Sequence, residues 1–254
     1  MPVIKASVRI RQAMASVANL RQQASEYPEL AQTVLAIKQL QAQRFAGTYS
    51  NLLTSSVYGA SAEFFLQELY GARDFSQRDQ QFAHVAGALE LTLPQSAVQT
   101  ALTLAELHCL TETLDFAMAR CWQLAPGCAA PEQRYVDCWK SVGHPSERQW
   151  QLSTVLAIGS TLGELTRKRS LRMTLKLMRK PAALAGLDAL QTFLETGFDR
   201  FASMVQKGGA VQVFLDTIRE RETQWIAQLF DLDAAQCTAQ LGTTLALAPQ
   251  GKPA

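Results

Sequence analysis

The sequence predicts an all-α protein, a multi-helix bundle of about eight to ten helices. Two observations support this class. Apolar residues recur at helical spacing along most of the 254 residues, and no run shows the strict alternation of a β-strand. Prolines, glycines and capping residues interrupt this pattern where helices would begin or end.

The expected helices follow in chain order. An apolar stripe from Val3 to Leu20 predicts a first helix that stops near Tyr27, because a proline follows it. A long second helix begins near Glu29, and Gly47 is expected to bend it. Further helices are expected at residues 60–70, 76–92, 95–124, 132–142, 146–165, 171–178, 187–201 and 211–229, and the segment 95–124 is either one long helix or two stacked ones. Pro181 is expected to stop the helix at 171–178.

The domain organisation follows from the breaks in this pattern. Residues 1–232 are expected to form a single helical domain with two lobes. The loop at 126–131, which contains Pro126, Gly127 and Pro131, is the best candidate for the boundary between the lobes. Residues 233–254 are polar and contain proline and glycine, so we expect a weakly ordered C-terminal tail.

Composition excludes several classes of protein. Hydrophobic residues make up 48% and charged residues 18%, as in a globular protein, and the net charge of +2 gives no global field for nucleic acid. The first residues lack the apolar core of a secretory signal, and no apolar stretch is long enough to span a membrane. No C-x-x-C spacing occurs among Cys109, Cys121, Cys128, Cys138 and Cys237. These features predict a cytoplasmic protein with reduced thiols.

The most distinctive segment reads EFFLQELYGARDFSQRD at residues 63–79. It predicts a helix, a glycine turn and a second helix capped by Ser76, with Asp79 three residues later in a capping-box pattern. The residues expected to form a structural, salt-bridged corner are Arg73, Asp74, Ser76, Arg78 and Asp79, with either Asp74 or Ser76 accepting hydrogen bonds from backbone N–H groups. Binding of a ligand at this corner is the alternative.

This segment resembles the F-F-L-x-E-L-Y-G-x-x-D-F-x-x-R-D signature of an uncharacterised bacterial family of all-helical proteins. The stretch LAELH at 104–108, the stretch RKP at 179–181 and the region 190–201 resemble other parts of that family. The resemblance covers about residues 45–205. It implies a helical fold and carries no activity.

His108 is a second candidate site. The run LAELH at 104–108 is weakly similar to the globin helix whose proximal histidine binds haem iron, which would make residues 57–125 globin-like. His108 would then be the axial ligand, with His84, Gln81 and Phe65 as further haem-binding candidates. The expected helix continues well past His108, unlike that of globins, and His84 lies only 24 residues upstream. A histidine packed on a long helix is the alternative.

Metal sites have little support. The three histidines include no Glu-x-x-His pair, so a di-iron site of the ferritin type is not expected. No nucleophile motif and no glycine-rich phosphate loop occurs either. The sequence therefore names no catalytic residue and no metal ligand.

The third candidate is a basic segment, RKRSLRMTLKLMRK at residues 167–180. It contains seven of the 24 Lys and Arg residues and no acidic residue, which leaves 17 basic against 22 acidic residues, a formal charge of −5, in the rest of the chain. A helical face of this kind suits an acidic partner or an anionic ligand, and a solvated face is the alternative. The candidate residues are Lys168, Arg169, Arg172, Lys176 and Arg179.

These features predict a non-enzymatic helical binding or scaffold protein. It would engage a partner protein or a small ligand through an apolar cleft or the basic helix, and a homodimer is possible. Nucleic acid is not expected as a partner, because the basic stripe lacks interleaved aromatic residues. The alternative function is a haem-binding, globin-like sensor with His108 as axial ligand.

Overall fold

The computed structural model describes residues 4–68, 71–92, 95–124 and 130–249, and within these ranges it contains twelve α-helices and no strand. This confirms the all-α class. The helices are α1 (Ala6–Ser25), α2 (Pro28–Thr48), α3 (Ser50–Leu53), α4 (Gly59–Glu68), α5 (Ser76–Thr92), α6 (Gln95–Leu124), α7 (Pro131–Val142), α8 (Pro145–Leu165), α9 (Arg169–Leu184), α10 (Asp188–Val205), α11 (Ala210–Asp231) and α12 (Ala234–Ala246).

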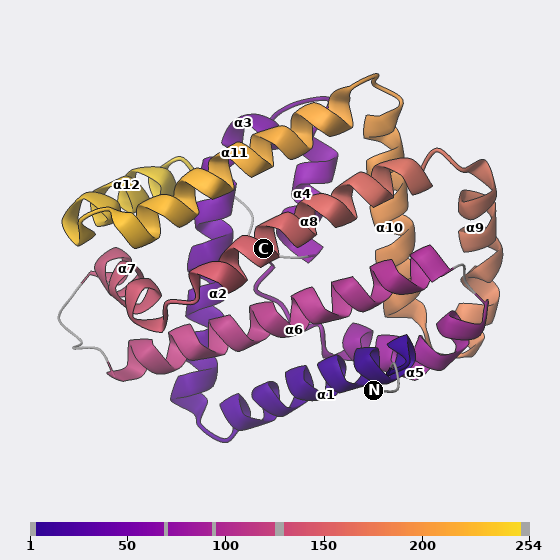
Figure 1. The fold of residues 1–254 in the computed structure, drawn as a ribbon, viewed down its shortest axis with the longest axis horizontal. Helices are drawn as coiled ribbons and strands as arrows, with labels where there is room; N and C mark the ends of the chain where they lie inside the picture. The colour runs from indigo at the N-terminus through magenta and orange to yellow at the C-terminus, as the bar shows by residue number, and fades with distance from the viewer. Residues whose placement is uncertain (1–3, 69–70, 93–94, 125–129, 250–254) are drawn as a thin grey trace.

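Long helices form the body of the molecule. In Figure 1, α1, α6, α8 and α11 lie in successive rows, and α2 crosses them. Helices α7 and α12 lie at one end of the body, whereas α9 and α10 lie at the other. Helix α9 packs against α10 at the edge of the molecule. This position leaves much of the α9 surface in solvent.

The core consists of three hydrophobic clusters that meet along α6. The first contains residues of α1, α5 and α6, including Ile10 and Leu102. The second joins α2, α6, α7, α11 and α12 around Met118. The third surrounds Phe214 and includes residues of α4, α8, α10 and α11, and Leu107 of α6 also belongs to it. Because α6 contributes to all three clusters, it holds the parts of the bundle together.

The region after Asp233 differs from the weakly ordered tail that the sequence suggested. Asp233 caps α12 by accepting hydrogen bonds from the backbone N–H groups of Ala235 and Gln236, at 3.0 and 3.4 Å. Cys237, Leu241 and Leu245 then bury one face of the helix. An N-cap and an apolar i,i+4 series form a helix because together they satisfy the first turn and bury a stripe.

Gly47 allows α12 to approach α2 closely. A Cβ atom at Gly47 would lie 1.9 Å from the backbone oxygen of Thr244, so no other residue fits without moving a helix. The glycine therefore serves this contact rather than the expected bend. Helix α2 ends one residue later, at Thr48, and α3 begins at Ser50, a short helix that the sequence did not predict separately.

Pro181 does not stop the basic helix as expected. Helix α9 continues to Leu184 with Pro181 inside it. A proline in a helix removes one backbone hydrogen bond, and here the chain continues because Ala185 N–H donates to Pro181 O at 3.0 Å. The proposed lobe boundary at 126–131 lies mostly outside the described residues.

Candidate functional site

The turn before α5 brings the predicted corner residues together. Asp74 accepts a hydrogen bond from the Ser76 backbone N–H at 2.8 Å, and the Ser76 hydroxyl donates to the same carboxylate at 2.9 Å. These two hydrogen bonds lower the pKa of Asp74. The sequence suggested Ser76 as the N-cap and either Asp74 or Ser76 as the acceptor of the first backbone N–H groups. In the structure α5 begins at Ser76, and Asp74 is the acceptor. Asp79, the expected capping-box partner, points elsewhere.

Arg78 fastens this turn to α4 and α10. Its guanidinium donates a hydrogen bond to the backbone oxygen of Glu68 at 3.1 Å. The side-chain carboxylate of Glu68 pairs with Arg73. The Arg78 guanidinium also lies 4.1 Å from the ring centre of Phe75 and 4.8 Å from that of Phe193. Burial lowers the pKa of Arg78 despite the nearby carboxylates of Asp79 and Glu68. The arginine is thus held by charge and by two aromatic faces.

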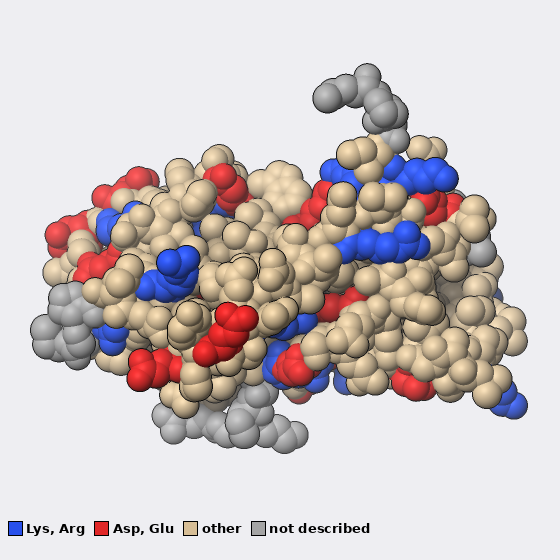
Figure 2. All heavy atoms as spheres, turned by 90° about the horizontal axis from the view of Figure 1, so that it is seen from below, with Lys and Arg blue, Asp and Glu red and all other residues tan. Residues whose placement is uncertain are grey.

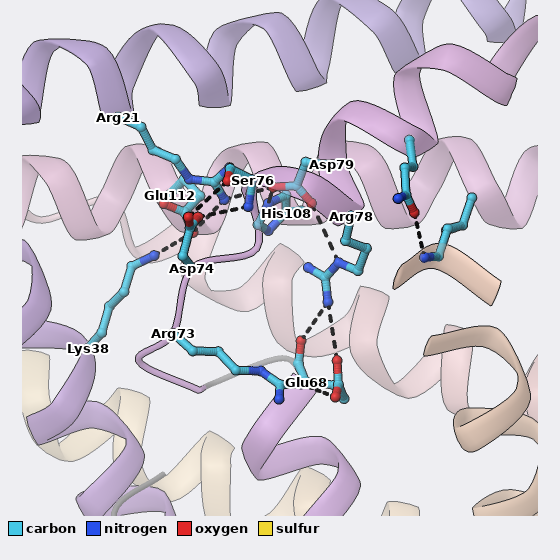
Figure 3. Close-up of polar contacts among 12 residues, drawn as sticks. Arg21, Lys38, Glu68, Arg73, Asp74, Ser76, Arg78, Asp79, His108 and Glu112 are labelled. Atoms are coloured by element: carbon cyan, nitrogen blue, oxygen red, sulfur yellow. Dashed lines mark hydrogen bonds and ion pairs between the residues drawn. The ribbon is translucent and has the colours of Figure 1, made fainter. Parts of the chain in front are cut away.

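Asp79 is the centre of the network shown in Figure 3. The residue is 5% exposed, and its carboxylate lies 2.8 Å from His108 Nε2 and 2.7 Å from Arg21 Nη2. Burial acts to raise the pKa of Asp79, but the hydrogen bond and charge of His108 and the charges of Arg78 and Arg21 outweigh it. The pKa of this carboxyl therefore lies below its usual value.

A second buried carboxylate extends the network to α2. Lys38 of α2 donates a hydrogen bond to Glu112 of α6, and Arg21 of α1 lies 3.9 Å from the same carboxylate. The chain of contacts thus joins α1, α2, α5 and α6 (Figure 3). Each carboxylate in it has a cationic partner, which suits a structural network that fixes the relative positions of helices.

The four haem candidates do not gather around one space. His108 Nε2 is occupied by Asp79, and His84 is exposed on α5. Gln81 is buried, and its side-chain oxygen accepts a hydrogen bond from Leu190 N–H of α10 at 2.8 Å. Phe65 is packed in the core, with its ring centre 5.6 Å from that of Phe201. The resemblance to globins therefore gains no support from these positions.

The sequence reasoning missed a buried ion pair between α2 and α11. Arg44 donates two hydrogen bonds to the carboxylate of Glu222, at 2.8 and 3.0 Å, and Tyr49 donates a third at 3.0 Å. Burial acts to lower the pKa of Arg44, but the charge and hydrogen bonds of Glu222 raise it above its usual value. The partners are 178 residues apart, so no local pattern could have shown this pair.

Other buried ionisable residues lie near Lys38, at the α2 end of the Asp79–Glu112 network. Asp115 of α6 is 3% exposed, and burial raises its pKa despite the positive charges of Lys38 and Arg148. The Arg148 guanidinium of α8 lies 3.8 Å from the ring centre of Trp139. In the described ranges, no group of three or more His, Cys, Asp and Glu residues is arranged to hold a metal ion.

Some of the basic residues on and beside α9 form ion pairs with α10, and others do not. Arg172 pairs with Asp199 at 2.9 Å, and Arg179 binds both oxygens of Glu195 at 2.8 and 2.7 Å, so two of the five predicted residues are engaged with α10. Within the part of the chain that the structure describes, the other three form no ion pair: Lys168, Arg169 and Lys176.

Apolar side chains on α9 also face solvent. Met173, Leu177 and Leu184 are 61%, 70% and 90% exposed, and their spacing places them on one side of the helix. The inner side of α9 includes Ala182, which is buried, and Leu171 and Leu175, which are half-buried. Figure 2 shows one face on which basic and acidic residues are interspersed and separated by uncharged surface.

No described helix is both long enough and apolar enough to cross a lipid bilayer. The twelve described helices form an all-α bundle with buried ion pairs in its interior and exposed apolar side chains on a basic helix, α9. The chain belongs to the family described as "Domain of unknown function (DUF8198)", whose model matches residues 20–236. No curated protein and no solved structure matches it.

Proposed function

We propose that this protein is a non-enzymatic, cytoplasmic binding protein that engages an acidic partner protein through α9. The observation that carries the proposal is the exposed stripe of Met173, Leu177 and Leu184 beside the basic residues Lys176 and Lys180. Exposed apolar side chains of this size on one helix face are typical of an interaction site. The adjacent lysines favour carboxylates on the partner.

The stripe is too small to bind through apolar contact alone. Complete burial of one fully exposed side chain of this kind contributes about 1.5–3 kcal/mol to binding. Because the three side chains are only partly exposed, burying the whole stripe contributes about 5 kcal/mol. Association costs at least about 4 kcal/mol and often more than 10 kcal/mol. Charge pairs must therefore supply the difference, which predicts a partner with an acidic segment that also carries apolar side chains, and a complex that weakens in salt.

The test is affinity purification from the source cells with the full chain, at about 50 mM and 500 mM salt. We expect an acidic protein that is retained at low salt and lost at high salt. It should be lost with Lys176→Glu/Lys180→Glu and with Leu177→Asp, and it should bind the purified chain directly. Arg120→Glu is the matched control, since Arg120 is also exposed and the C-terminal end of α6 lies at the opposite end of the molecule (Figure 1).

Three results would contradict the proposal. The first is retention of the same proteins by wild type and all variants. The second is a dimer of the pure protein that Leu177→Asp converts to monomer, because a second copy would then cover the stripe. The third is sedimentation with phosphatidylserine vesicles that depends on Lys176 and Lys180, because an amphipathic basic helix can also bind an anionic membrane.

Haem binding at His108 is the alternative that the sequence raised. Ligation through Nε2 would have to break the 2.8 Å contact with Asp79 and leave that buried carboxylate without one of its cationic or hydrogen-bonding partners. We therefore expect that hemin added to the protein gives no sharp Soret band that His108→Ala removes. Such a band would favour the haem alternative over the binding protein.

A further inference from the structure

A hollow of about 260 Å³ is lined by residues from the end of α8, the beginning of α9 and the C-terminal half of α10. Three arginines line it: Arg167, Arg169 and Arg172. It is separate from the exposed apolar stripe of α9, whose members Met173 and Leu177 do not line it. Its contents therefore need not be the partner proposed above.

The charge in this hollow is only partly compensated. Arg172 pairs with Asp199 at 2.9 Å, but both side chains are about half exposed. Arg167 and Arg169 form no ion pair within the described ranges. Helix α9 also begins here, at Arg169, without a side-chain cap, so its first backbone N–H groups add partial positive charge. The hollow thus offers several donors to one anion.

The α10 side of the hollow is mainly apolar, although Gln206 at the end of α10 also lines it. Phe198, Ala202 and Val205 of α10 line it, with Phe198 buried and the other two half-buried. A ligand that fills the space would place its charged group against the arginines and an apolar group against α10. The volume lies just below the range of about 300–1,000 Å³ typical of sites for drug-sized ligands, so the ligand would be small.

We propose that this hollow binds a small phosphate monoester whose ester group is compact and apolar. A phosphate offers three terminal oxygens and close to two negative charges, which matches several guanidinium groups better than a carboxylate does. The carboxylate of Asp199 does not line the hollow, and its ion pair is with Arg172 alone. The apolar side then distinguishes the ester from free phosphate.

The test is calorimetric titration of the full chain with phenyl phosphate, inorganic phosphate and benzoate. We expect phenyl phosphate to bind at least about tenfold more tightly than either of the others, since it alone uses both sides of the hollow. Arg167→Ala/Arg169→Ala should weaken phenyl phosphate binding by about tenfold or more, because two charged donors are lost. Arg120→Ala is the matched control and should leave binding unchanged.

Two further variants separate a binding role from a loss of folding. Ala202→Leu adds bulk to the apolar side, so it should weaken phenyl phosphate binding and leave inorganic phosphate unaffected. Asp199→Asn removes the competing carboxylate beside Arg172, so it should tighten binding, which a merely destabilised protein would not do. Absence of phenyl phosphate binding at about 10 mM, tighter binding of benzoate, or binding indifferent to Arg167→Ala/Arg169→Ala would overturn the proposal.

Discussion

Replacing Glu222 with leucine would leave the guanidinium of Arg44 as a buried charge without its carboxylate. The side chains of the pair are only 8% and 11% exposed, and they share two hydrogen bonds of 2.8 and 3.0 Å. Removing one partner of such a pair typically costs about 3–5 kcal/mol. That is a large part of the roughly 5–15 kcal/mol that stabilises a typical folded protein. We expect Glu222→Leu to lower the free energy of unfolding by this amount.

The measurement is urea unfolding at pH 7, followed by circular dichroism. Arg44→Met/Glu222→Leu should recover most of the loss, because replacing both charges leaves none buried. Arg219→Met is the control, since its ion pair with Asp216 is half exposed and should contribute less than about 1 kcal/mol. A loss below about 1 kcal/mol in Glu222→Leu, or a double variant less stable than the single one, would refute the reasoning.

Two further predictions concern the helix contacts and the polar network. Gly47→Ala should lower the melting temperature and reduce the free energy of unfolding by about 1–3 kcal/mol or more, because its Cβ would clash with Thr244 O. Gly242→Ala on α12 is the control, because its Cβ would meet open space, and it should raise the free energy of unfolding by up to about 1 kcal/mol. Because folding lowers the pKa of Asp79, its stabilisation is full above the ordinary aspartate pKa and is lost as pH falls through the lower folded value. In Asp79→Asn, the urea concentration at the midpoint of unfolding should therefore fall less steeply as the pH is lowered into the acid range. An unchanged dependence on pH would disprove this.

Local patterns were sufficient to predict most of the helices. The segment at 95–124, which lies between two prolines, was expected to form one long helix or two stacked ones, and it forms the single helix α6 (Gln95–Leu124). Helix α12 was missed, although its signal was present in Asp233 and in the apolar series Cys237, Leu241 and Leu245. The polar residues between them concealed it.

The sites were harder to predict because their contacts are long-range. His108 was expected to be either a ligand or a packed histidine, and its partner Asp79 belonged to a different predicted site 29 residues away. The basic character of α9 was evident, but the sequence could not show that α10 places Glu195 and Asp199 opposite two of its arginines. Distances between distant segments depend on tertiary packing, which periodicity does not encode.

The cluster that contains α12 also constrains the order in which the chain can fold during synthesis. Ala24, Leu30 and Ile37 leave the ribosome early, yet they pack in the same cluster as Leu241 and Leu245, more than 200 residues later. The cluster of α1, α5 and α6 needs no residue beyond Cys109, so it can form first. Helices α6 and α7 can cover part of α2 earlier, but the part of α2 that packs against α12 stays uncovered until translation reaches α12. Apolar surface that is exposed during this interval favours aggregation of the nascent chain.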